Sequence, residues 1–457
     1  MSVLDRRPTS LLGPRRTDGA TPHRPRAGSD GGGRDRGVDG LRAYAIGGVV
    51  FGHWLVTALV LGPDDALRTA SPLAAMPALV PVTWLFQTLG LFFFVSGYAS
   101  ARSLRSAAAR GLGPARWLRR RLGRLGRPVL LLLGGWLAVL AVAALLGTPA
   151  DTLRTAATLV VSPLWFLLPL VVLIASTAPL ARALDRYGPV RLAVPAVALV
   201  TLSDLAGRSG DPSGWPVPLP GDGVWRVPVA VLAGWLLPYL LGMALADGRL
   251  GGRRTAVGLL LAGAAGMAGL GGAGYPLSAV GVPGDGMSNL DPPSLFAVSL
   301  ALAQVGAALL VRPALAGALA RPGRWAPVNR LNSVAISVYL WHQSTLLGVT
   351  ALAALAARLA GTGPVPGLHT VPDGPGWVAA RLAWLPLLVL VLSVLVGRAG
   401  GDRRRHRDAQ GPASREASGR PGPARTVHPL QPEPRGACAP TSTSGHDGPR
   451  GEVERVQ

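Results

Sequence analysis

Ten long apolar runs recur along the 457-residue chain, and they limit its fold more than any other feature of the sequence. A helix of about 20 residues, rising 1.5 Å per residue, crosses the hydrocarbon core of a bilayer. Backbone polar groups inside a bilayer must pair within the chain, so runs of this kind fold as helices. The runs cover residues 39–61, 80–101, 128–147, 164–183, 190–206, 228–246, 255–273, 294–312, 332–358 and 377–397. The sequence therefore predicts an all-α, polytopic membrane helix bundle with about ten transmembrane helices.

The composition agrees with a membrane protein. Hydrophobic residues make up 49% of the chain and charged residues 15%, which is too little charge for a soluble surface. The sequence holds no lysine, so all 45 basic residues are arginine, and they gather in the tails and in alternate loops. Membrane topology explains this placement, so the net charge of +22 does not indicate a nucleic-acid partner.

The arginine-rich loops alternate with loops that hold aspartate and little arginine. The arginine-rich loops fall within residues 102–127, 182–191, 249–254 and 312–330. Cytoplasmic loops of membrane proteins carry the excess of basic residues. We therefore expect a multi-pass protein of the cell membrane with an even number of spans and both termini in the cytoplasm.

Two polar segments rich in arginine, glycine and proline flank the apolar region. Residues 1–35 lack the apolar stretch of a signal peptide, and residues 399–457 are polar throughout. We expect both to be disordered cytoplasmic tails and residues 36–398 to form one transmembrane domain. The single cysteine, Cys438, lies in the second tail, so neither a disulfide nor a cysteine-based metal site is expected.

Ionisable groups inside a bilayer are costly and usually functional. Arg42 and His53 share the first apolar run and lie eleven positions apart. At 3.6 residues per turn they fall about 20° from alignment on one helix face and roughly 16 Å apart. This face carries an anion binder at its predicted cytoplasmic edge and a base near mid-membrane. The alternatives are a topological anchor for Arg42 and a hydrogen-bonded packing residue for His53, and for His53 we favour function.

A second histidine lies in the ninth run. Tyr339 and His342 are three positions apart, so they share a helix face. Such a pair can position an acceptor or stabilise an oxyanion. A hydrogen-bonded cluster between helices fits the spacing at least as well.

The loop between the second and third runs ends in a series of arginines. Arg121, Arg124 and Arg127 recur every three residues and form one stripe if the segment is helical. Guanidinium groups match phosphate oxygens, so the stripe is a candidate site for a phosphorylated donor from the cytosol. Topology or contact with anionic lipid explains the same arginines without such a donor.

The order and spacing of these residues resemble the acyltransferase-3 family of integral membrane acyltransferases. The first-helix signature of that family is an arginine, ten intervening residues and a histidine, as in Arg42 and His53. The other matching segments are residues 39–43, 92–98, 121–124, 164–167 and 339–342. The resemblance extends over residues 36–398 and implies the same ten-helix core.

The resemblance implies an O-acyltransferase that moves an acyl group, often acetyl, from cytosolic acyl-CoA to a hydroxyl. Family acceptors are glycans of the cell envelope, lipids or secondary metabolites. Acyl-CoA is then a co-substrate, with no bound cofactor and no metal, and membrane lipid is the other expected partner. By the same resemblance His53 is the catalytic histidine, Arg42 its motif partner, and Arg121 and Arg124 contact the CoA phosphates.

The chain departs from the family pattern at two places. Many members carry an acidic residue just before the phenylalanine-rich segment, where this chain has Leu91 and Phe92. Many also have a histidine before the tryptophan of the fourth span, where this chain has Leu164. These differences weaken any inference about the acceptor.

Two other classes of function fit parts of the sequence. The first is a transporter or flippase for a lipid-linked or acylated substrate. Coupled transporters usually carry carboxylates at mid-membrane, whereas every aspartate here maps to a loop, a span end or a tail. The second is a scaffold that recruits partners through its arginine-rich tails, and it leaves His53 unexplained.

Overall fold

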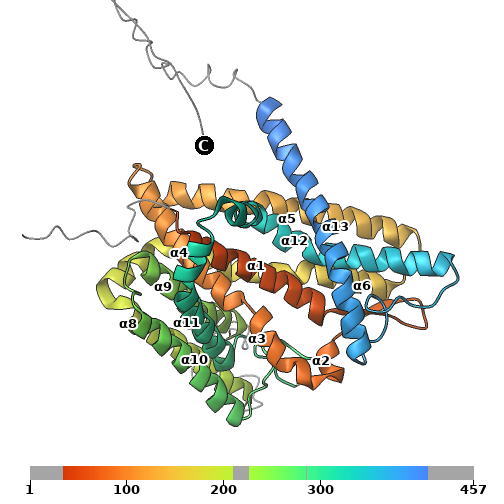
Figure 1. The fold of residues 1–457 in the computed structure, drawn as a ribbon, viewed down its shortest axis with the longest axis horizontal. Coiled ribbons are helices and arrows are strands. Elements are labelled where there is room, and N and C mark those ends of the chain that lie inside the picture. Colours follow the sequence, from red (N-terminus) through yellow and green to blue (C-terminus); the bar gives the residue numbers. More distant parts are fainter. Residues whose placement is uncertain (1–33, 209–225, 285, 410–457) are drawn as a thin grey trace, which may run out of the picture. The chain divides into compact units, whose positions relative to one another are not determined.

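Helices make up most of the computed structural model, which describes residues 34–208, 226–284 and 286–409 (Figure 1). The all-α fold class is therefore confirmed for the described residues. Most of the two predicted tails, residues 1–35 and 399–457, lies outside them. The last helix continues to Ala409, beyond the predicted end of the transmembrane domain.

The long helices are α1 (Arg36–Val56), α4 (Leu89–Ala108), α5 (Pro114–Leu145), α6 (Ala150–Val161), α7 (Leu167–Ala175), α8 (Thr177–Arg208), α9 (Arg226–Ala246), α10 (Arg253–Gly272), α11 (Leu295–Ala318), α12 (Pro322–Leu359) and α13 (Pro375–Ala409). The short elements are the strands β1 (Ala58–Leu61) and β2 (Leu67–Ala70), the helices α2 (Pro72–Ala75) and α3 (Thr83–Phe86), and the 3-10 helices η1 (Pro77–Val82) and η2 (Ser162–Phe166).

In the described part of the chain, nine helical stretches are long and apolar enough to cross a membrane. They are Pro77–Ala108, Pro114–Leu145, Ala150–Ala175, Thr177–Arg208, Val227–Ala246, Arg253–Gly272, Leu295–Ala318, Pro322–Leu359 and Pro375–Gly397, and they correspond in order to the second through tenth predicted spans. The first predicted span corresponds to α1, whose 21 residues are less apolar because they include Asp39, Arg42 and His53. The chain is thus a multi-pass membrane protein.

Two predicted span boundaries are wrong. Residues 58–61 do not extend the first helix but form β1, because α1 ends at Val56 and the backbone of Thr57 turns extended. The fourth predicted span, 164–183, crosses a break between two helices at Ser176. The stretch that spans is Ala150–Ala175, which begins earlier because the polar residues at its start are helical.

Contacts between distant segments gather the arginine-rich loops at one end of the bundle. We call this the arginine-rich end, and it holds residues 109–113, 247–252 and 319–321. The contacts are Arg36 to the carbonyls of Leu319 and Ala320 (both 2.9 Å), Arg312 to Asp35 (2.9 Å), Arg249 to the carbonyl of Leu184 (2.8 Å), and the ion pair of Arg105 with Asp247.

The aspartate-bearing loops lie at the opposite end, which we call the hairpin end. It holds residues 57–71, 146–149, 273–284, 286–294 and 360–374. Its contacts are the Leu67 amide to Thr152 (2.9 Å), the Leu61 amide to the carbonyl of His369 (3.3 Å), Arg208 to the carbonyl of Ala273 (2.7 Å), and the ion pair of Arg358 with Asp65. Loops that the charge pattern separates are therefore also separate in space.

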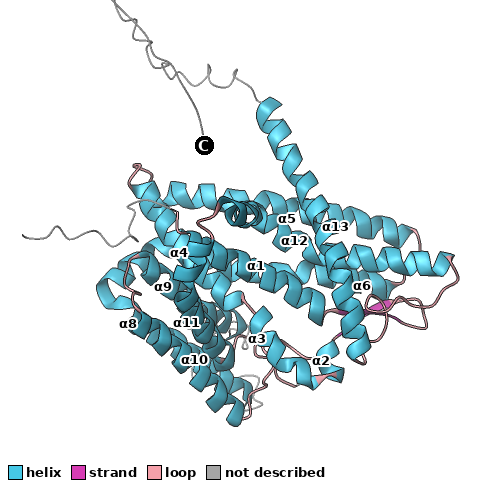
Figure 2. Ribbon diagram, in the orientation of Figure 1, coloured by secondary structure: helices cyan, strands magenta, loops and turns pink. Residues whose placement is uncertain are grey.

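The strands β1 and β2 form an antiparallel hairpin beside α6, with Ala58 opposite Ala70 (Figure 2). Arg68 on β2 pairs with Asp64 (2.5 Å) in the turn and with Asp151 (2.9 Å) at the start of α6. The hydrogen bonds from Arg68 lower the pKa of the Asp64 carboxyl to about 2. These ion pairs fasten the turn of the hairpin to the start of α6.

Small residues set the closest approach of helices in the bundle. A Cβ atom at Gly97 of α4 would lie 2.1 Å from the carbonyl oxygen of Tyr239, and one at Gly242 of α9 would lie 1.8 Å from that of Phe94. Only glycine permits backbones this close, as in other membrane helix pairs. This crossing places the inward faces of α4 and α9 against each other.

The outward faces are apolar. On α5, the large side chains of Leu130, Leu137 and Leu145 are exposed, and α13 likewise exposes Leu382 and Leu390. Exposed leucines on long helices are expected where lipid, not water, surrounds the protein. Among the described residues, buried polar side chains are most numerous on α12, which packs against α1 where the site lies.

Candidate active site

The helix α1 positions the two residues of the first-helix pattern. It begins after Asp35, whose side chain accepts a hydrogen bond from the Val38 amide (3.1 Å). Arg42 and His53 then lie on one face, Arg42 half-buried toward the arginine-rich end and His53 one turn before the helix ends. The amide of Thr57 donates to the carbonyl of His53 (2.9 Å), so the backbone at this histidine is held by the final helical turn.

His53 meets a second histidine across the interface of α1 and α12. Its ring lies 5.1 Å from that of His342, centroid to centroid. Its Nδ1 atom is 3.3 Å from the amide nitrogen of Gln343, the next residue on α12. His53 is partly exposed, whereas His342 is fully buried. The structure therefore brings two predicted site residues together and adds Gln343 to them.

The local contacts of His342 determine which of its nitrogens carries the proton. Nδ1 is 2.5 Å from the carbonyl oxygen of Tyr339, so it must carry a hydrogen and donate it. Neutral Nε2 then holds a lone pair, and no described residue hydrogen-bonds to it. The indole of Trp54 donates to the carbonyl of His342 (2.9 Å) and fixes the helix backbone at this point. A buried acceptor without a partner is unusual and is typical of functional sites.

Tyr339 lies beside this pair but its hydroxyl is engaged elsewhere. The hydroxyl donates to the carbonyl oxygen of Pro163, at the start of η2. Its ring is 5.8 Å from that of His342 and 4.8 Å from that of Phe166. Tyr339 thus joins η2 to α12, and a role as oxyanion donor would require its hydroxyl to leave Pro163.

Three motif segments that lie far apart in the sequence converge through aromatic contacts. The rings of Phe93 and Phe166 are 5.8 Å apart, and Phe166 contacts Tyr339 at 4.8 Å. Tyr339 leads to His342 and from there to His53. One row of rings therefore connects residues 92–98, 164–167 and 339–342 to the histidine of the first helix.

His53 opens onto a cavity of about 650 Å³ near the hairpin end. The walls come from the end of α1, the hairpin, η1, α3, η2, the start of α13, and Val280, Gly281, Pro283 and Leu290. Tyr339 also lines this cavity, while His342 lies behind its surface. The volume suits a small-molecule site, and no aspartate or glutamate is among the described residues that line it.

Arg42 belongs to a second polar cluster, nearer the arginine-rich end. Arg121 of α5 donates to the hydroxyl of Ser100 (3.0 Å), stacks over the ring of Trp117 (5.7 Å), and lies close enough to Arg42 for their positive charges to repel. Among the described residues, none forms a hydrogen bond or ion pair with Arg42. Asp39 attracts its charge but is itself paired with Arg34 (2.5 Å). Two half-buried guanidinium groups with no carboxylate between them form a candidate anion site.

The three arginines of the predicted stripe do not share one face of the helix. The segment is helical, within α5, but successive positions three residues apart turn by about 60° around a helix. Arg121 faces inward, whereas Arg124 and Arg127 are exposed. Arg124 donates to the carbonyl of Arg120 (3.3 Å) on its own helix. The structure places Arg121 alone of the three beside Arg42.

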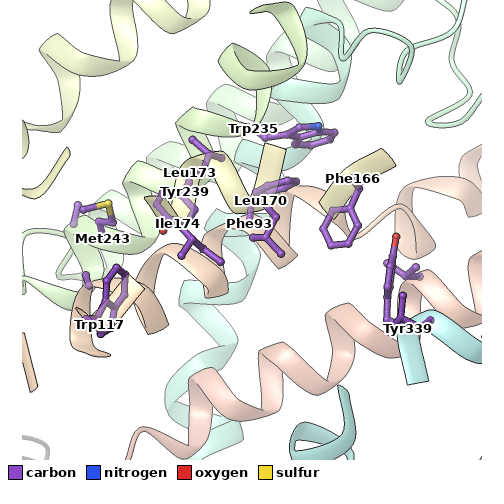
Figure 3. Close-up of a cluster of buried hydrophobic side chains, with 14 of the residues drawn as sticks. Phe93, Trp117, Phe166, Leu170, Leu173, Ile174, Trp235, Tyr239, Met243 and Tyr339 are labelled. Atoms are coloured by element: carbon purple, nitrogen blue, oxygen red, sulfur yellow. The ribbon is translucent and has the colours of Figure 1, made fainter. Parts of the chain in front are cut away.

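Apolar packing separates the two polar clusters. A buried cluster runs from Trp117, next to Arg121, to Tyr339, next to His342 (Figure 3). Phe93 and Trp235 stack at its centre, 5.3 Å apart and nearly parallel. Arg42 and His53 lie roughly 16 Å apart along α1, so the anion site and the histidine pair do not touch.

No three His, Cys, Asp or Glu side chains come together as metal ligands among the described residues. The site instead consists of histidines, arginines and the amide of Gln343, which suit proton transfer and anion binding.

Comparison with known families shows which protein family contains the domain that carries these two clusters. Residues 35–397 match the family profile described as an acyltransferase domain. The chain belongs to the acyltransferase 3 family. The match covers every residue of both clusters, so this acyltransferase carries them within its family domain. No curated protein and no solved structure matched the chain.

Sequence reasoning missed two residues of the candidate site. Gln343 contacts His53, but an amide next to a histidine in sequence gives no signal of its own. Arg381 lies in the tenth span, is fully buried and lines the cavity. A charged residue inside an apolar span was the signal that would have found it.

Proposed function

We propose that this acyltransferase moves an acyl group, with acetyl as the first candidate, from cytosolic acyl-CoA to a hydroxyl group. The acceptor is a glycan, a lipid or a secondary metabolite at the cell membrane. Family membership supports the reaction class. The observation that carries the site assignment is His53, which opens onto a cavity and has a second, fully buried histidine against it.

The donor binds, in this proposal, at the arginine-rich end. The positive-inside rule supports a cytoplasmic location for that end, and acyl-CoA is found in the cytoplasm. Arg42 and Arg121 supply two guanidinium groups for the phosphates of CoA, and Trp117 and Ser100 hold Arg121 in place. Arg124 and Arg127 are exposed near this entrance and add positive charge that attracts the donor.

The thioester then has to travel from the arginines to the histidine. The interval is roughly 16 Å along α1, and apolar side chains fill it. The extended pantetheine arm of CoA is a chain suited to such a distance. Its binding along this face displaces part of the packing around Val49, which lies between Arg42 and His53 and also lines the cavity.

His53 acts as the general base in the proposed reaction. It accepts the proton of the acceptor hydroxyl, whose oxygen attacks the thioester carbonyl carbon. The tetrahedral intermediate collapses, the carbon–sulfur bond breaks, and the proton on His53 passes to the departing thiolate. The products are the ester and free CoA. The lone pair on Nε2 of His342 stabilises the imidazolium that forms between the two proton transfers.

Gln343 selects the tautomer of His53 that this reaction needs. Its amide has two orientations, which exchange oxygen and nitrogen. With the nitrogen against Nδ1, the oxygen of Gln343 is left buried without a partner among the described residues. With the oxygen against Nδ1, it accepts the Nδ1 proton and leaves a lone pair on Nε2 of His53. We assign the second orientation to the active enzyme.

The decisive experiment compares a deletion strain with strains that express His53→Gln or the wild type. Mass spectrometry of glycans, lipids and metabolites should show an acylated product that is lost on deletion, restored by the wild type and absent with His53→Gln. The glutamine fills the space and keeps a polar contact, so the thermal stability should change little. Arg358→Met, which removes an exposed ion pair at the hairpin end, is the control and should restore the product.

Acylation restored by His53→Gln would reject the catalytic role. If no acyl mass changes but a lipid-linked substrate is redistributed across the membrane, the protein is a transporter.

A further inference from the structure

Arg381 is a buried cation at the wall of the cavity that the acyl-transfer steps do not use. It lies on the second turn of α13, at the hairpin end, and none of its side chain is exposed. Nη2 donates to the carbonyl oxygen of Thr57 (2.9 Å), and the guanidinium lies over the ring of Trp377, 4.8 Å from its centroid. These contacts hold the side chain in one position beside the end of α1.

The charge of Arg381 has no counter-ion in the described part of the chain. Nε and Nη1 are buried and have no hydrogen-bond partner there. Three exposed arginines of the hairpin end behave differently, since Arg68, Arg154 and Arg358 each pair with an aspartate at the surface. A buried arginine is rarely left with neither a carboxylate nor a full set of acceptors.

The cavity next to Arg381 offers no negative charge. The described lining residues include no carboxylate, and apart from Arg381 their polar groups are hydroxyls, the amide of Gln87, two indoles and His53. The field of Arg381 in a low-dielectric cavity therefore favours an anion over a neutral ligand. Trp377 and Leu382 add an apolar wall on the same helix.

We propose that Arg381 is the counter-ion for an anionic group on the acceptor, a phosphate or a carboxylate, bound at the hairpin end of the cavity. The site of acyl transfer is the one assigned above, so this inference rests on the proposed function and narrows its substrate class. The donor phosphates have their own arginines at the other end, which leaves this one for the acceptor.

The geometry limits where the anionic group lies relative to the reacting hydroxyl. Arg381 binds the carbonyl of Thr57, which is four residues, or about 6 Å of helix rise, beyond His53. An acceptor that contacts both Arg381 and His53 must carry its reacting hydroxyl only a few bonds away from its acid group. Sugar acids, sugar phosphates and polyol phosphates meet this condition, either free or as lipid headgroups.

The test is thermal unfolding of the full chain in a non-ionic detergent, with no acyl donor present. The probes are glycerol 3-phosphate, glycerate, phosphatidate in mixed micelles, and glycerol as the neutral control. A ligand that binds the folded state raises the midpoint of unfolding, here by about 2 °C near saturation. We expect a rise with at least one anionic probe, no rise with glycerol, and loss of the rise in Arg381→Met.

Matched variants separate this site from others. Arg358→Met, at the same end, and Arg121→Met, at the donor site, should keep the full rise. Arg381→Lys keeps the positive charge but loses the two-pronged guanidinium, so it should show a smaller rise in the unfolding midpoint. It replaces Arg381→Met in the test if that variant does not fold. The identity of the active probe distinguishes phosphate from carboxylate and soluble from lipid acceptors.

A wild type that no anionic probe stabilises, or a rise that Arg381→Met retains, overturns the proposal. His53→Gln keeps a polar contact to the acceptor hydroxyl and leaves Arg381 in place, so it should keep most of the rise. Its acylation defect is measured separately, so failure of the catalytic assignment and failure of this site give different results.

Discussion

Replacing Gly242 by alanine tests the packing that positions both clusters. The new Cβ atom would lie 1.8 Å from the carbonyl oxygen of Phe94 and 2.8 Å from the amide nitrogen of Tyr98. Both obstacles are backbone, so no side chain can rotate away. To reach an ordinary contact of 3.4 Å, α4 and α9 must separate locally by about 1.6 Å.

The expected cost follows from that separation. Overpacking of a well-packed core typically costs about 1–3 kcal/mol, and a clash between backbones belongs at the upper end of that range. The separation also disturbs the stack of Phe93 on Trp235 and moves Ser100, the partner of Arg121. We expect Gly242→Ala to lower the free energy of unfolding by about 2–3 kcal/mol and the unfolding midpoint by roughly 4–8 °C.

The assay is thermal unfolding of the detergent-solubilised protein, followed by intrinsic fluorescence. Gly258→Ala on α10 is the matched control, because its Cβ would meet nothing within 4 Å. Its stability should be unchanged or higher by about 0.5–1 kcal/mol. Gly97→Ala should behave like Gly242→Ala, and the double variant should cost less than the sum, since one separation relieves both clashes. A Gly242→Ala protein as stable as the control would refute this packing.

Three further predictions concern the site and the hairpin. Gln343→Leu should lower kcat about 10–100-fold with little change in the KM for acyl-CoA. Gln343→Glu should recover part of the rate, because a carboxylate oxygen still accepts the imidazole proton of His53. Equal losses of kcat in both variants would contradict a positioning role for Gln343. Arg121→Met should raise the KM for acyl-CoA about tenfold, whereas Arg124→Met, exposed on the same helix, should raise it less, as initial-rate kinetics can show. Asp64 should titrate near pH 2 by carbon NMR, and Arg68→Met should return its pKa toward the ordinary value of about 4. The pKa of Asp64 is lower in the folded protein than in the unfolded chain. The ion pair therefore stabilises the hairpin at pH values above the unfolded pKa, and this stabilisation is lost as the pH falls toward 2.

Much of the fold follows from local properties of the sequence. Apolar run length predicts the order and the approximate place of the spanning stretches, because the bilayer fixes how many residues must be apolar. Several of the helices begin ten or more residues before the predicted span, as Pro114–Leu145 does. The prediction fails where polarity changes inside a helix. The polar start of α6 hid the true fourth span, and the apolar residues 58–61 are strand and not helix. Alternating loop charge correctly separates the two ends of the bundle, while its assignment of one end to the cytoplasm stays a prediction.

The candidate site was only partly within reach of the sequence. Helix periodicity places Arg42 and His53 on one face and Tyr339 beside His342, since both depend on positions within a single helix. The sequence also shows the motif segments. It does not show that His342 meets His53, that Arg124 and Arg127 face away from Arg42, or that Gln343 and Arg381 belong to the site at all.

The sequence by itself therefore determined the helices, their order and the faces of each that carry polar groups. The tertiary structure decided which faces meet. That depends on how closely pairs of helices approach and at what angle they cross, which glycines such as Gly97 and Gly242 set by letting backbones touch. A contact between side chains on different helices is a property of that crossing and not of either helix, so the histidine pair and the cavity beside it appear only in three dimensions.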